Sequence, residues 1–550
     1  MIIRTLIIKG ILKIEKMNTL KKILFQPYPY IIIVLIGVSL KFYKLEHNYF
    51  WEDEIESILH TSGISDNDYM KLILKDTVLN VIYYKDLMHL NTQKYTIGSQ
   101  LKGLFTMPQF APLHHAILVF WHRIVGDEYI HYRLFSIFMF ILLLPFLFLL
   151  GKTLFNSELA GWMAVSLFSV SPFFSLYAQE ARYYILWAFF IVLSHYVFLR
   201  AIQINKIKWW IAYTVIGILA MYTSFFSSLF IFGHILYIGF RKKELWLTYL
   251  ISIFIIGLCY LPWIISLISF EDDINKNMSF LMHTENTSIW GILIGQLAGM
   301  ATIFASFEPK VWSSLLLNTS FGFGEGFHPQ YLTLIIHVFI DTLIIAAIVY
   351  LLKKSSKDAM FFLVFITLPF VVFVIVFDLS VSGLISFIWR YHVISFIGTF
   401  LIVINFFNEK FKQKKVIYIG MFFALTFLST ISTIKVSSYK HWTGNLSYND
   451  ESADYFSKLN NPLIILDYGD WYNNSHTLMF MNLCKSDSID ILRTTGDIEI
   501  INQQIEAKKY SEVFVIHTTD ELIKKLKSHY GTRLDSLEIA LWPPTYQINF

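Results

Sequence analysis

Long apolar stretches separated by short polar segments run from residue 28 to residue 434. A helix that crosses a membrane needs about 20 mostly apolar residues. Two apolar stretches, 112–126 and 289–306, are expected not to cross, the first because histidines interrupt it and the second as an interfacial or re-entrant helix. The pattern therefore predicts a polytopic α-helical membrane protein with about 11–13 spans. The eleven expected spans are 28–45, 133–151, 158–177, 183–202, 209–223, 225–241, 245–268, 331–352, 359–378, 391–408 and 415–434.

Basic residues recur in every second connecting segment, and they predict the orientation of the chain. Cytoplasmic loops carry an excess of lysine and arginine. The acidic segments 46–132 and 269–330 are then external loops, and residues 1–27 form a basic cytoplasmic leader. With eleven spans the C-terminus lies outside; if both 112–126 and 289–306 cross, the sidedness between them changes. The basic positions are Lys152, Lys206, Lys208, Arg241, Lys242, Lys243, Lys353, Lys354, Lys357 and the run from Lys410 to Lys415.

From residue 435 to residue 550 the composition becomes that of a soluble domain. Strands are expected at 462–467, 489–494 and 513–517, and helices near 475–482, at 497–509 and at 520–529, with Asp520 as a helix cap. This alternation predicts a small extracytoplasmic α/β domain with a largely parallel sheet. The domain lacks glycine signals for phosphate binding, so we expect a passive structural role, with docking or acceptor positioning as the alternative.

Composition agrees with the membrane prediction and narrows the setting. Of 550 residues, 55% are hydrophobic and 15% are charged, a balance that excludes a water-soluble protein. The two cysteines, Cys259 and Cys484, lie in segments of different character and are not expected to pair. Rich usage of Ile, Lys, Asn and Phe is typical of an AT-rich bacterial genome, which favours a bacterial inner membrane. Membrane lipids are the expected surroundings, and nucleic acid is not expected as a partner.

Charged and aromatic motifs recur at the predicted outer boundary of the spans. Four carboxylates, Glu52, Asp53, Glu54 and Glu56, directly follow the first span, where burying them without a cationic partner is costly. Because a helix bundle brings its ends together, the motifs are expected to meet, although an acidic, solvated loop start is the alternative. The other motifs are 111–115, 177–184, 222–226 and 389–392.

Arg182 and Arg390 are the candidates for binding a phosphate. A guanidinium stays charged and offers a planar fork of donors. Tyr391 could add a neutral donor. The alternative for each arginine is that it marks a helix end at the level of the lipid headgroups.

Asp53 is the candidate general base, placed to take a proton from an attacking hydroxyl. Glu54 and Glu180 could orient an acceptor, and the candidate ligands for a divalent cation such as Mg²⁺ or Mn²⁺ are carboxylates, Asp53 and Glu180 among them. His114 and His115 could orient substrate or cation, but such histidines are more often interfacial polar residues. No cofactor is certain from the sequence.

Several short motifs in a fixed order resemble those of glycosyltransferase family 39, the dolichyl-phosphate-mannose protein mannosyltransferases, whose bacterial relatives include the aminoarabinose lipid A transferases. The resemblance covers roughly residues 28–434. Ala111 stands where the family usually has a proline, and the segment from Asp53 to Pro112 is long, which leaves the acceptor side least defined. The motifs are Asp53-Glu54, Pro112-Leu113, Gly126-Asp-Glu with Arg133, Ser171-Pro172, Tyr177 to Tyr183, Tyr222-Thr223, Leu261-Pro-Trp263 and Arg390-Tyr391.

The resemblance implies a membrane enzyme of the C-type glycosyltransferase fold that uses a polyprenyl-phosphate sugar. It implies that Asp53 activates the acceptor for inverting transfer, with Glu54 as its motif neighbour, and that Arg390 and Tyr391 hold the lipid phosphate. The acceptor could be a protein, a lipid or a glycan. The alternative is a transporter or flippase for a lipid-linked glycan, against which stand the lack of a clear internal repeat and the gathering of charges at one face.

Overall fold

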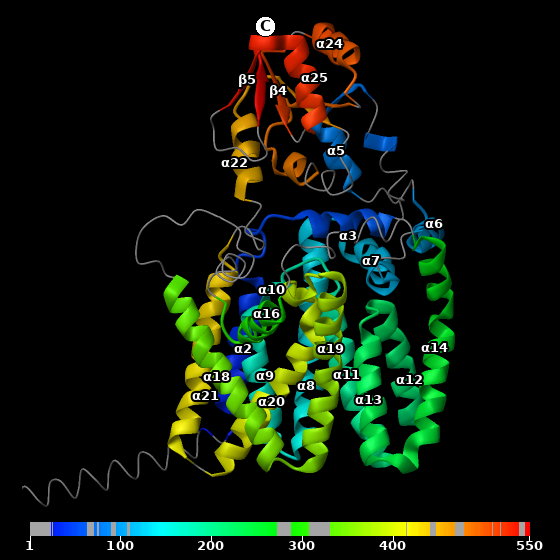
Figure 1. Ribbon diagram of the computed structural model, residues 1–550, viewed down its shortest axis with the longest axis vertical. Coiled ribbons are helices and arrows are strands. Elements are labelled where there is room, and N and C mark those ends of the chain that lie inside the picture. The colour runs from blue at the N-terminus through cyan, green and yellow to red at the C-terminus, as the bar shows by residue number, and fades with distance from the viewer. Residues whose placement is uncertain are drawn as a thin grey trace, which may run out of the picture.

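In the computed structural model, eleven helical rods fill the eleven stretches expected to span the membrane, and a small mixed domain lies beyond one end of them (Figure 1). We call that end of the helix bundle the domain end. The structure describes residues 24, 26–62, 71–73, 76–89, 95–106, 111–271, 288–306, 330–413, 415–439, 447–467, 478–494, 496–508, 510–516, 519–537 and 545–549. Most of the predicted leader 1–27 and of the predicted loop 269–330 lies outside these residues.

Seven helices are long and apolar enough to cross a membrane, and an eighth span is formed by α9 and α10 if that bent pair is counted as one. The remaining three rods, α2, α12 and α13, are shorter apolar helices. The prediction of a polytopic helical membrane protein is thereby confirmed. The rods are α2 (Tyr28–Phe42), α8 (Tyr129–Phe155), α9 (Glu158–Ser169) with α10 (Pro172–Ala178), α11 (Tyr184–Ile204), α12 (Ile207–Thr223), α13 (Ser227–Arg241), α14 (Trp246–Ser269), α18 (Gln330–Lys354), α19 (Lys357–Val381), α20 (Val393–Lys412) and α21 (Val416–Val436).

Shorter helices gather at or near the domain end. Of the two stretches expected not to cross, α7 (Pro112–Val125) has 14 residues and α16 (Ile289–Ala301) has 13. At 1.5 Å per residue each covers about 20 Å, less than the roughly 30 Å of a bilayer core. The other short elements are α3 (Glu52–Ser62), α5 (Val81–Leu87), α6 (Ile97–Gly103) and the 3₁₀ turns η1 (Leu104–Thr106), η2 (Lys243–Leu245), η4 (Ile385–Phe387) and η5 (Trp389–His392).

Helix α20 lies at the centre of the bundle, with nearly all of its residues buried. Small residues allow its close packing: a Cβ on Gly398 would lie 2.0 Å from Oγ1 of Thr367 on α19, and one on Gly233 of α13 would lie 2.0 Å from the Phe365 carbonyl oxygen. The outer helices expose large apolar side chains such as Phe254 and Ile335, as a lipid-facing surface requires.

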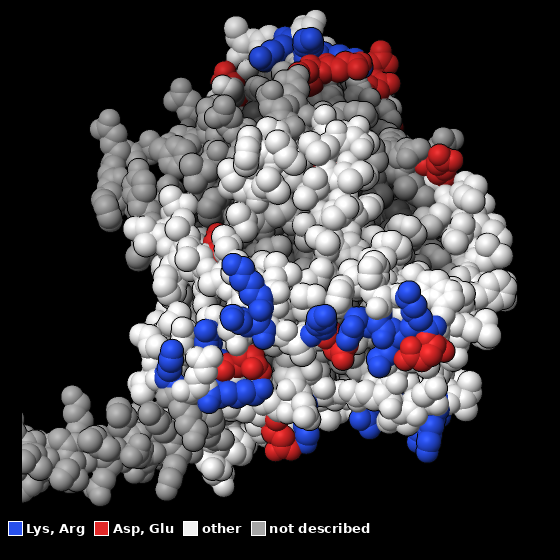
Figure 2. All heavy atoms as spheres, turned by 60° about the horizontal axis from the view of Figure 1, so that its bottom comes forward, with Lys and Arg blue, Asp and Glu red and all other residues white. Residues whose placement is uncertain are grey.

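Basic residues occupy the ends of the helices that point away from the small domain. Lys152, Arg241, Lys353 and Lys410 lie in the last turns of α8, α13, α18 and α20. Figure 2, which brings that end of the molecule forward, shows lysine and arginine spread across it. This asymmetry is the one that predicts a cytoplasmic side, and the orientation itself remains a prediction.

The C-terminal domain is an α/β unit around a six-stranded sheet of order β1-β3-β2-β4-β6-β5. Only the central pairs β2–β3 and β2–β4 are parallel, whereas β1–β3, β4–β6 and β5–β6 are antiparallel, so the prediction of a largely parallel sheet is wrong. Its elements are α22 (Ser447–Phe456), β2 (Pro462–Asp467), β3 (Asp490–Thr494), α24 (Ile498–Ala507), β4 (Glu512–Ile516), α25 (Asp520–Tyr530), η6 (Gly531–Arg533), β5 (Leu534–Ser536) and β6 (Tyr546–Ile548).

Two details of the domain correct the sequence-based expectations. Thr519 caps α25 by accepting from the Leu522 N–H, so Asp520 is the first helical residue and does not cap. The edge strand β1 (Val78–Asn80) comes from the first predicted external loop, about 400 residues before its partner strand β3. A three-residue strand carries no periodic signal, which is why the pattern did not predict it. The helix expected near 475–482 is present where it is described, at residues 478–483.

Candidate active site

Asp53 lies between two arginines from distant parts of the chain. Its Oδ2 is 3.1 Å from Nη1 of Arg390 and 3.6 Å from Nη2 of Arg182. Arg182 also donates from Nη1 to the Asp53 carbonyl oxygen at 2.8 Å. Asp53 is in the first turn of α3, which lies across the domain end of the bundle (Figure 1). The structure thus brings together three of the residues predicted to form the site.

The neighbouring Glu54 faces a different partner. Its carboxylate is fully buried and receives two bonds from Arg133, Nε to Oε1 at 2.9 Å and Nη2 to Oε2 at 2.7 Å. The backbone N–H groups of Ala181 and Trp51 donate to the same carboxylate at 2.8 and 3.3 Å. Successive helical residues point about 100° apart, so adjacent acids can serve different partners.

Arg133 holds the chain before α3 as well. Its Nη1 donates to the carbonyl oxygens of Leu45 and Asn48 at 2.6 and 2.9 Å, and its Nη2 donates to that of Tyr49 at 2.9 Å. One buried guanidinium in the first two turns of α8 therefore fixes both Glu54 and the segment that leads to Asp53. The sequence reasoning assigned Arg133 no role, although an arginine in a long apolar stretch is a signal for a buried partner.

Arg390 is presented by the short turn η5, and Asp378 organises the chain just before it. The Asp378 carboxylate accepts from the backbone N–H groups of Ile385 and Ser386 at 3.0 and 2.7 Å and from the Ser386 hydroxyl. The Arg390 guanidinium stacks over the Trp51 ring, 5.5 Å from its centroid. Since Trp51 precedes α3, this contact adds to the link between the arginine and the acidic segment.

Glu180 and Arg182 lie in the tight connection between α10 and α11. Both side chains are buried, and the hydroxyl of Ser136 on α8 donates to the Glu180 carbonyl oxygen at 2.5 Å. Oε2 of Glu180 has no hydrogen-bond partner among the described residues. Burial, followed by the negative charges of Glu54 and Asp53, raises the pKa of Glu180 well above its ordinary value. Glu180 is therefore held neutral beside two charged carboxylates.

Tyrosines surround the arginine pair. Tyr177 and Tyr183 each pack against Tyr184, with ring centroids 4.9 and 4.5 Å apart, and Tyr391 lies beside Arg390, whose guanidinium is 5.7 Å from its ring centroid. Phenol rings give the cluster apolar walls with polar tips, which suits a site at the boundary between membrane and water.

His114 and His115 are buried beneath α3 near the start of α7. The ring of His115 lies 5.2 Å from that of His114 and 5.6 Å from that of His60 on α3. Neither ring nitrogen of His114 has a hydrogen-bond partner among the described residues. Burial, and secondly the nearby charge of Arg182, lowers the pKa of His114 to about 3, so the ring is neutral at ordinary pH. Both histidines are core residues near Arg182 and not interfacial ones.

No group of three or more His, Cys, Asp or Glu side chains suited to a metal ion occurs within the described part of the chain. Of the two candidate ligands predicted from sequence, Asp53 pairs with two arginines and Glu180 is neutral. A divalent cation would need ligands from outside this set or from its substrate.

A break in one span sets the depth of the Glu180–Arg182 turn. Helices α9 and α10 meet at an angle of 62°, with Pro172 opening α10. Lys41 of α2, fully buried, donates from Nζ to the Ser169 carbonyl oxygen at 2.8 Å and to the Ser175 hydroxyl, so it satisfies a helix end that the break leaves open. The sequence reasoning missed Lys41, whose signal was a lysine inside the first apolar stretch.

Fold and cluster together define a polytopic helical membrane protein with a buried Arg–Asp–Arg site at the end that carries an α/β domain. Within it, residues 109–266 match the family model described as dolichyl-phosphate-mannose-protein mannosyltransferase. This match confirms the family resemblance noted from the sequence over that part of the chain. A search among curated proteins finds no match.

Two solved structures are similar to this chain at low identity. The archaeal oligosaccharyltransferase AglB from Archaeoglobus fulgidus, in complex with an inhibitory peptide and a dolichol-phosphate, is 11% identical with a TM-score of 0.47, over 90% of this chain and 70% of that one. ArnT from Cupriavidus metallidurans, bound to undecaprenyl phosphate, is 12% identical with a TM-score of 0.43, over 94% of this chain and 98% of that one.

Proposed function

We propose that this protein is a membrane glycosyltransferase that moves a sugar from a polyprenyl-phosphate donor to an acceptor hydroxyl, with inversion at the anomeric carbon. The observation that carries the proposal is the cluster in which Asp53 lies within 3.1 Å of Arg390 and 3.6 Å of Arg182. It supplies a carboxylate for an acceptor proton and guanidinium groups for a phosphate in one place. The matched family model, named for a lipid-phosphate sugar, supports the same donor class.

Arg390 binds the donor phosphate in this proposal, and Tyr391 and Arg182 line the same place. Arg390 is the more accessible arginine, with 21% of its side chain exposed against 6% for Arg182. A phosphate carries more charge than a carboxylate and accepts the same fork of donors. An arriving phosphate therefore competes with Asp53 for Arg390 and loosens the ion pair.

Loosening that pair arms the base. A carboxylate held by two guanidinium groups resists protonation, because both charges favour its ionised form. Once Arg390 turns to the phosphate, Asp53 takes the acceptor hydroxyl proton, the oxygen bonds to the anomeric carbon, and the bond from that carbon to the phosphate oxygen breaks. Polyprenyl phosphate leaves with the electron pair, and attack opposite this leaving group inverts the centre.

The remaining predicted site residues take supporting roles. Glu54 acts as a positioning residue, because Arg133 and two backbone N–H groups already hold both of its oxygens. Glu180 and His114 offer buried polar atoms that have no partner among the described residues, so they suit the hydroxyl groups of a sugar. His115 packs between His114 and His60 and supports that side. The proposal routes no step through Mg²⁺ or Mn²⁺.

The setting proposed is a bacterial inner membrane with the N-terminus in the cytoplasm and the C-terminal domain outside. The basic residues at the helix ends opposite the domain end support this orientation. The site then lies at the outer leaflet, where the lipid tail of the donor can remain among lipids. The acceptor is a protein, lipid or glycan hydroxyl at the same face.

The test is sugar transfer by purified protein in nanodiscs, supplied with a panel of polyprenyl-phosphate sugars and candidate acceptors. The proposal expects polyprenyl phosphate to be released from at least one donor, in an amount equal to the glycosylated acceptor formed. In proteoliposomes, movement of intact donor between leaflets with no release from any donor would instead identify the transporter or flippase.

A further inference from the structure

The first loop of the bundle supplies a strand to the C-terminal sheet. Val78, Leu79 and Asn80 of β1 lie opposite Leu492, Ile491 and Asp490 of β3, and the Val81 N–H donates to the Ile489 carbonyl oxygen at 2.9 Å. This loop begins at the acidic segment with Asp53 and returns to the bundle at α7. The sheet edge is therefore completed by the same loop that carries the proposed base.

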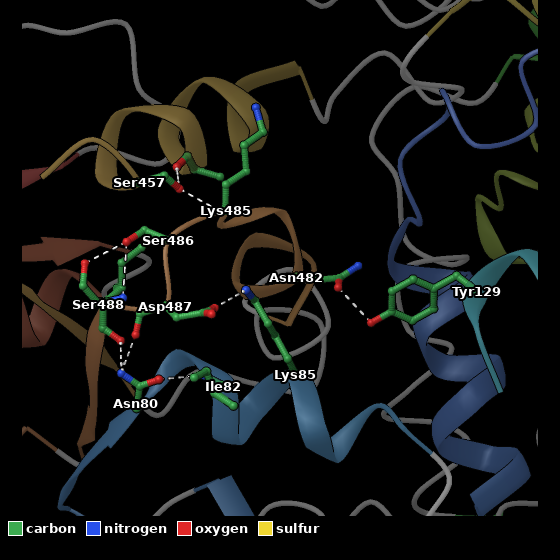
Figure 3. Close-up of polar contacts among 12 residues, drawn as sticks. Asn80, Ile82, Lys85, Tyr129, Ser457, Asn482, Lys485, Ser486, Asp487 and Ser488 are labelled. Carbon is green, nitrogen blue, oxygen red and sulfur yellow. Dashed lines mark hydrogen bonds and ion pairs between the residues drawn. The ribbon is translucent and has the colours of Figure 1, made fainter.

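Asn80 fastens this junction with both ends of its side-chain amide (Figure 3). Its Oδ1 accepts from the Ile82 N–H and caps α5, while its Nδ2 donates to the Asp487 carbonyl oxygen at 2.9 Å and lies 3.2 Å from Oδ1 of Asp490. Lys85, one turn into α5, pairs with Asp487 at 3.2 Å. The contact is specific in direction, because the two ends of the amide cannot exchange roles here.

A second contact leads from the domain towards the site. The Tyr129 hydroxyl, at the start of α8, donates to Oδ1 of Asn482 at 2.8 Å (Figure 3). The Tyr129 ring stacks on Phe50, with centroids 4.6 Å apart, and Phe50 lies under the Arg133 guanidinium at 5.3 Å. Arg133 is the clamp on Glu54, the residue after Asp53.

We propose that the C-terminal domain is a positioning domain that holds the acidic segment, here residues Asn48–Ser62, in its catalytic place. Pairing with β3 fixes the middle of a loop that would otherwise have to be ordered by its ends alone, and ordering each backbone residue costs about 1–2 kcal/mol. The stack through Tyr129 and Phe50 fixes the segment directly before α3. The assignment of a catalytic place rests on the proposed function, whereas the mechanical coupling does not.

The sharpest perturbation is Asn80→Asp. The aspartate keeps the oxygen that caps α5 but replaces the donor nitrogen by an oxygen facing Asp490, which turns attraction into repulsion. The matched control is Asn549→Asp at the opposite edge of the sheet, where the Asn549 Nδ2 donates to Asp535 at 2.7 Å. The control places the same new charge beside the same type of partner without touching the loop.

Hydrogen exchange of the whole protein in nanodiscs measures the coupling without any substrate. We expect Asn80→Asp to speed exchange of the amides in the acidic segment by about tenfold, the effect of losing roughly 1.4 kcal/mol, and Asn549→Asp to leave them unchanged. Sugar transfer should fall in the first variant alone, with donor binding retained. Equal exchange of the acidic segment in wild type and both variants would overturn the proposal.

A disulfide between the strands provides a rescue. The bond from Val81 to Ile489 makes that pair a hydrogen-bonded one, so Val78 and Leu492 form a close, non-hydrogen-bonded pair that suits a disulfide. In a Cys259→Ser, Cys484→Ala background, oxidised Val78→Cys/Leu492→Cys should restore slow exchange to the Asn80→Asp variant, and reduction should reverse it. Failure of the formed disulfide to restore protection would overturn the positioning role. Absence of transfer by wild type with normal exchange behaviour would instead overturn the proposed function alone.

Discussion

Replacing Arg133 by methionine tests the clamp beneath the site. The change removes both bonds to the buried Glu54 carboxylate and three bonds to the carbonyl oxygens of Leu45, Asn48 and Tyr49. It keeps an unbranched apolar side chain of similar length, so the loss is electrostatic more than steric. Its partner change, Glu54→Gln, keeps the shape and an acceptor oxygen for the Ala181 N–H.

The magnitude follows from what is left unpaired. Breaking a buried ion pair by removing one partner costs about 3–5 kcal/mol, because the remaining charge stays buried. The three orphaned carbonyl oxygens add about 1 kcal/mol each. Arg133→Met should therefore destabilise the fold by at least 4 kcal/mol or so, and adding Glu54→Gln should recover about 2 kcal/mol or more by removing the stranded carboxylate.

The assay is a double-mutant cycle on the free energy of unfolding, measured in mixed detergent micelles for wild type, both single variants and the double variant. A coupling energy of about 2 kcal/mol or more is expected between the two positions. If the two changes add within roughly 0.5 kcal/mol, or if Arg133→Met alone costs less than about 1 kcal/mol, the clamp does not stabilise the acidic segment and the reasoning fails.

Three further predictions follow from single contacts. Arg390→Lys keeps the charge near Asp53 but loses the planar fork, so binding of polyprenyl phosphate should weaken about tenfold in a competition assay, and unchanged affinity would remove Arg390 from the phosphate site. Burial and nearby carboxylates raise the pKa of Glu180 in the folded protein above its ordinary 4.5, so wild type loses stability as pH rises above about 4.5. Glu180→Gln should then match wild type near pH 4 and exceed it in melting temperature at pH 8, a difference that a flat pH profile would contradict. Lys41→Met removes the charged donor to the Ser169 carbonyl oxygen at the broken span and should lower the unfolding free energy by about 1.5–3 kcal/mol, whereas a change within 0.5 kcal/mol would show that the break needs no cap.

Sequence periodicity and length were sufficient to predict the helical architecture. Each of the eleven apolar stretches became a helix, because a chain in lipid must satisfy its backbone polar groups within its own segment. The same reasoning separated the short α7 and α16 from the spans. The break between α9 and α10 was not predicted, since Pro172 follows a helix that is continuous in its hydrophobic pattern.

The site was predicted in its members but not in its pairings. Asp53, Arg182 and Arg390 were expected at one face and do meet there. That Glu54 turns to Arg133 could not be predicted, because adjacent residues on α3 differ by about 100° in direction and the sequence does not fix where a helix begins to within one residue. The pairing of β1 with β3 joins segments with no local signal for one another, so only the folded chain reveals it.

Asp53→Asn tests the central claim most directly, compared with wild type and with Asp127→Asn, an exposed aspartate near the start of α8. All three proteins would be given the donor and acceptor identified for wild type, and release of polyprenyl phosphate would be measured alongside donor binding. The account predicts that Asp53→Asn binds donor but loses release by a factor of about 10² or more, while Asp127→Asn keeps both. Release by Asp53→Asn at the wild-type rate would contradict the assignment of Asp53 as the base.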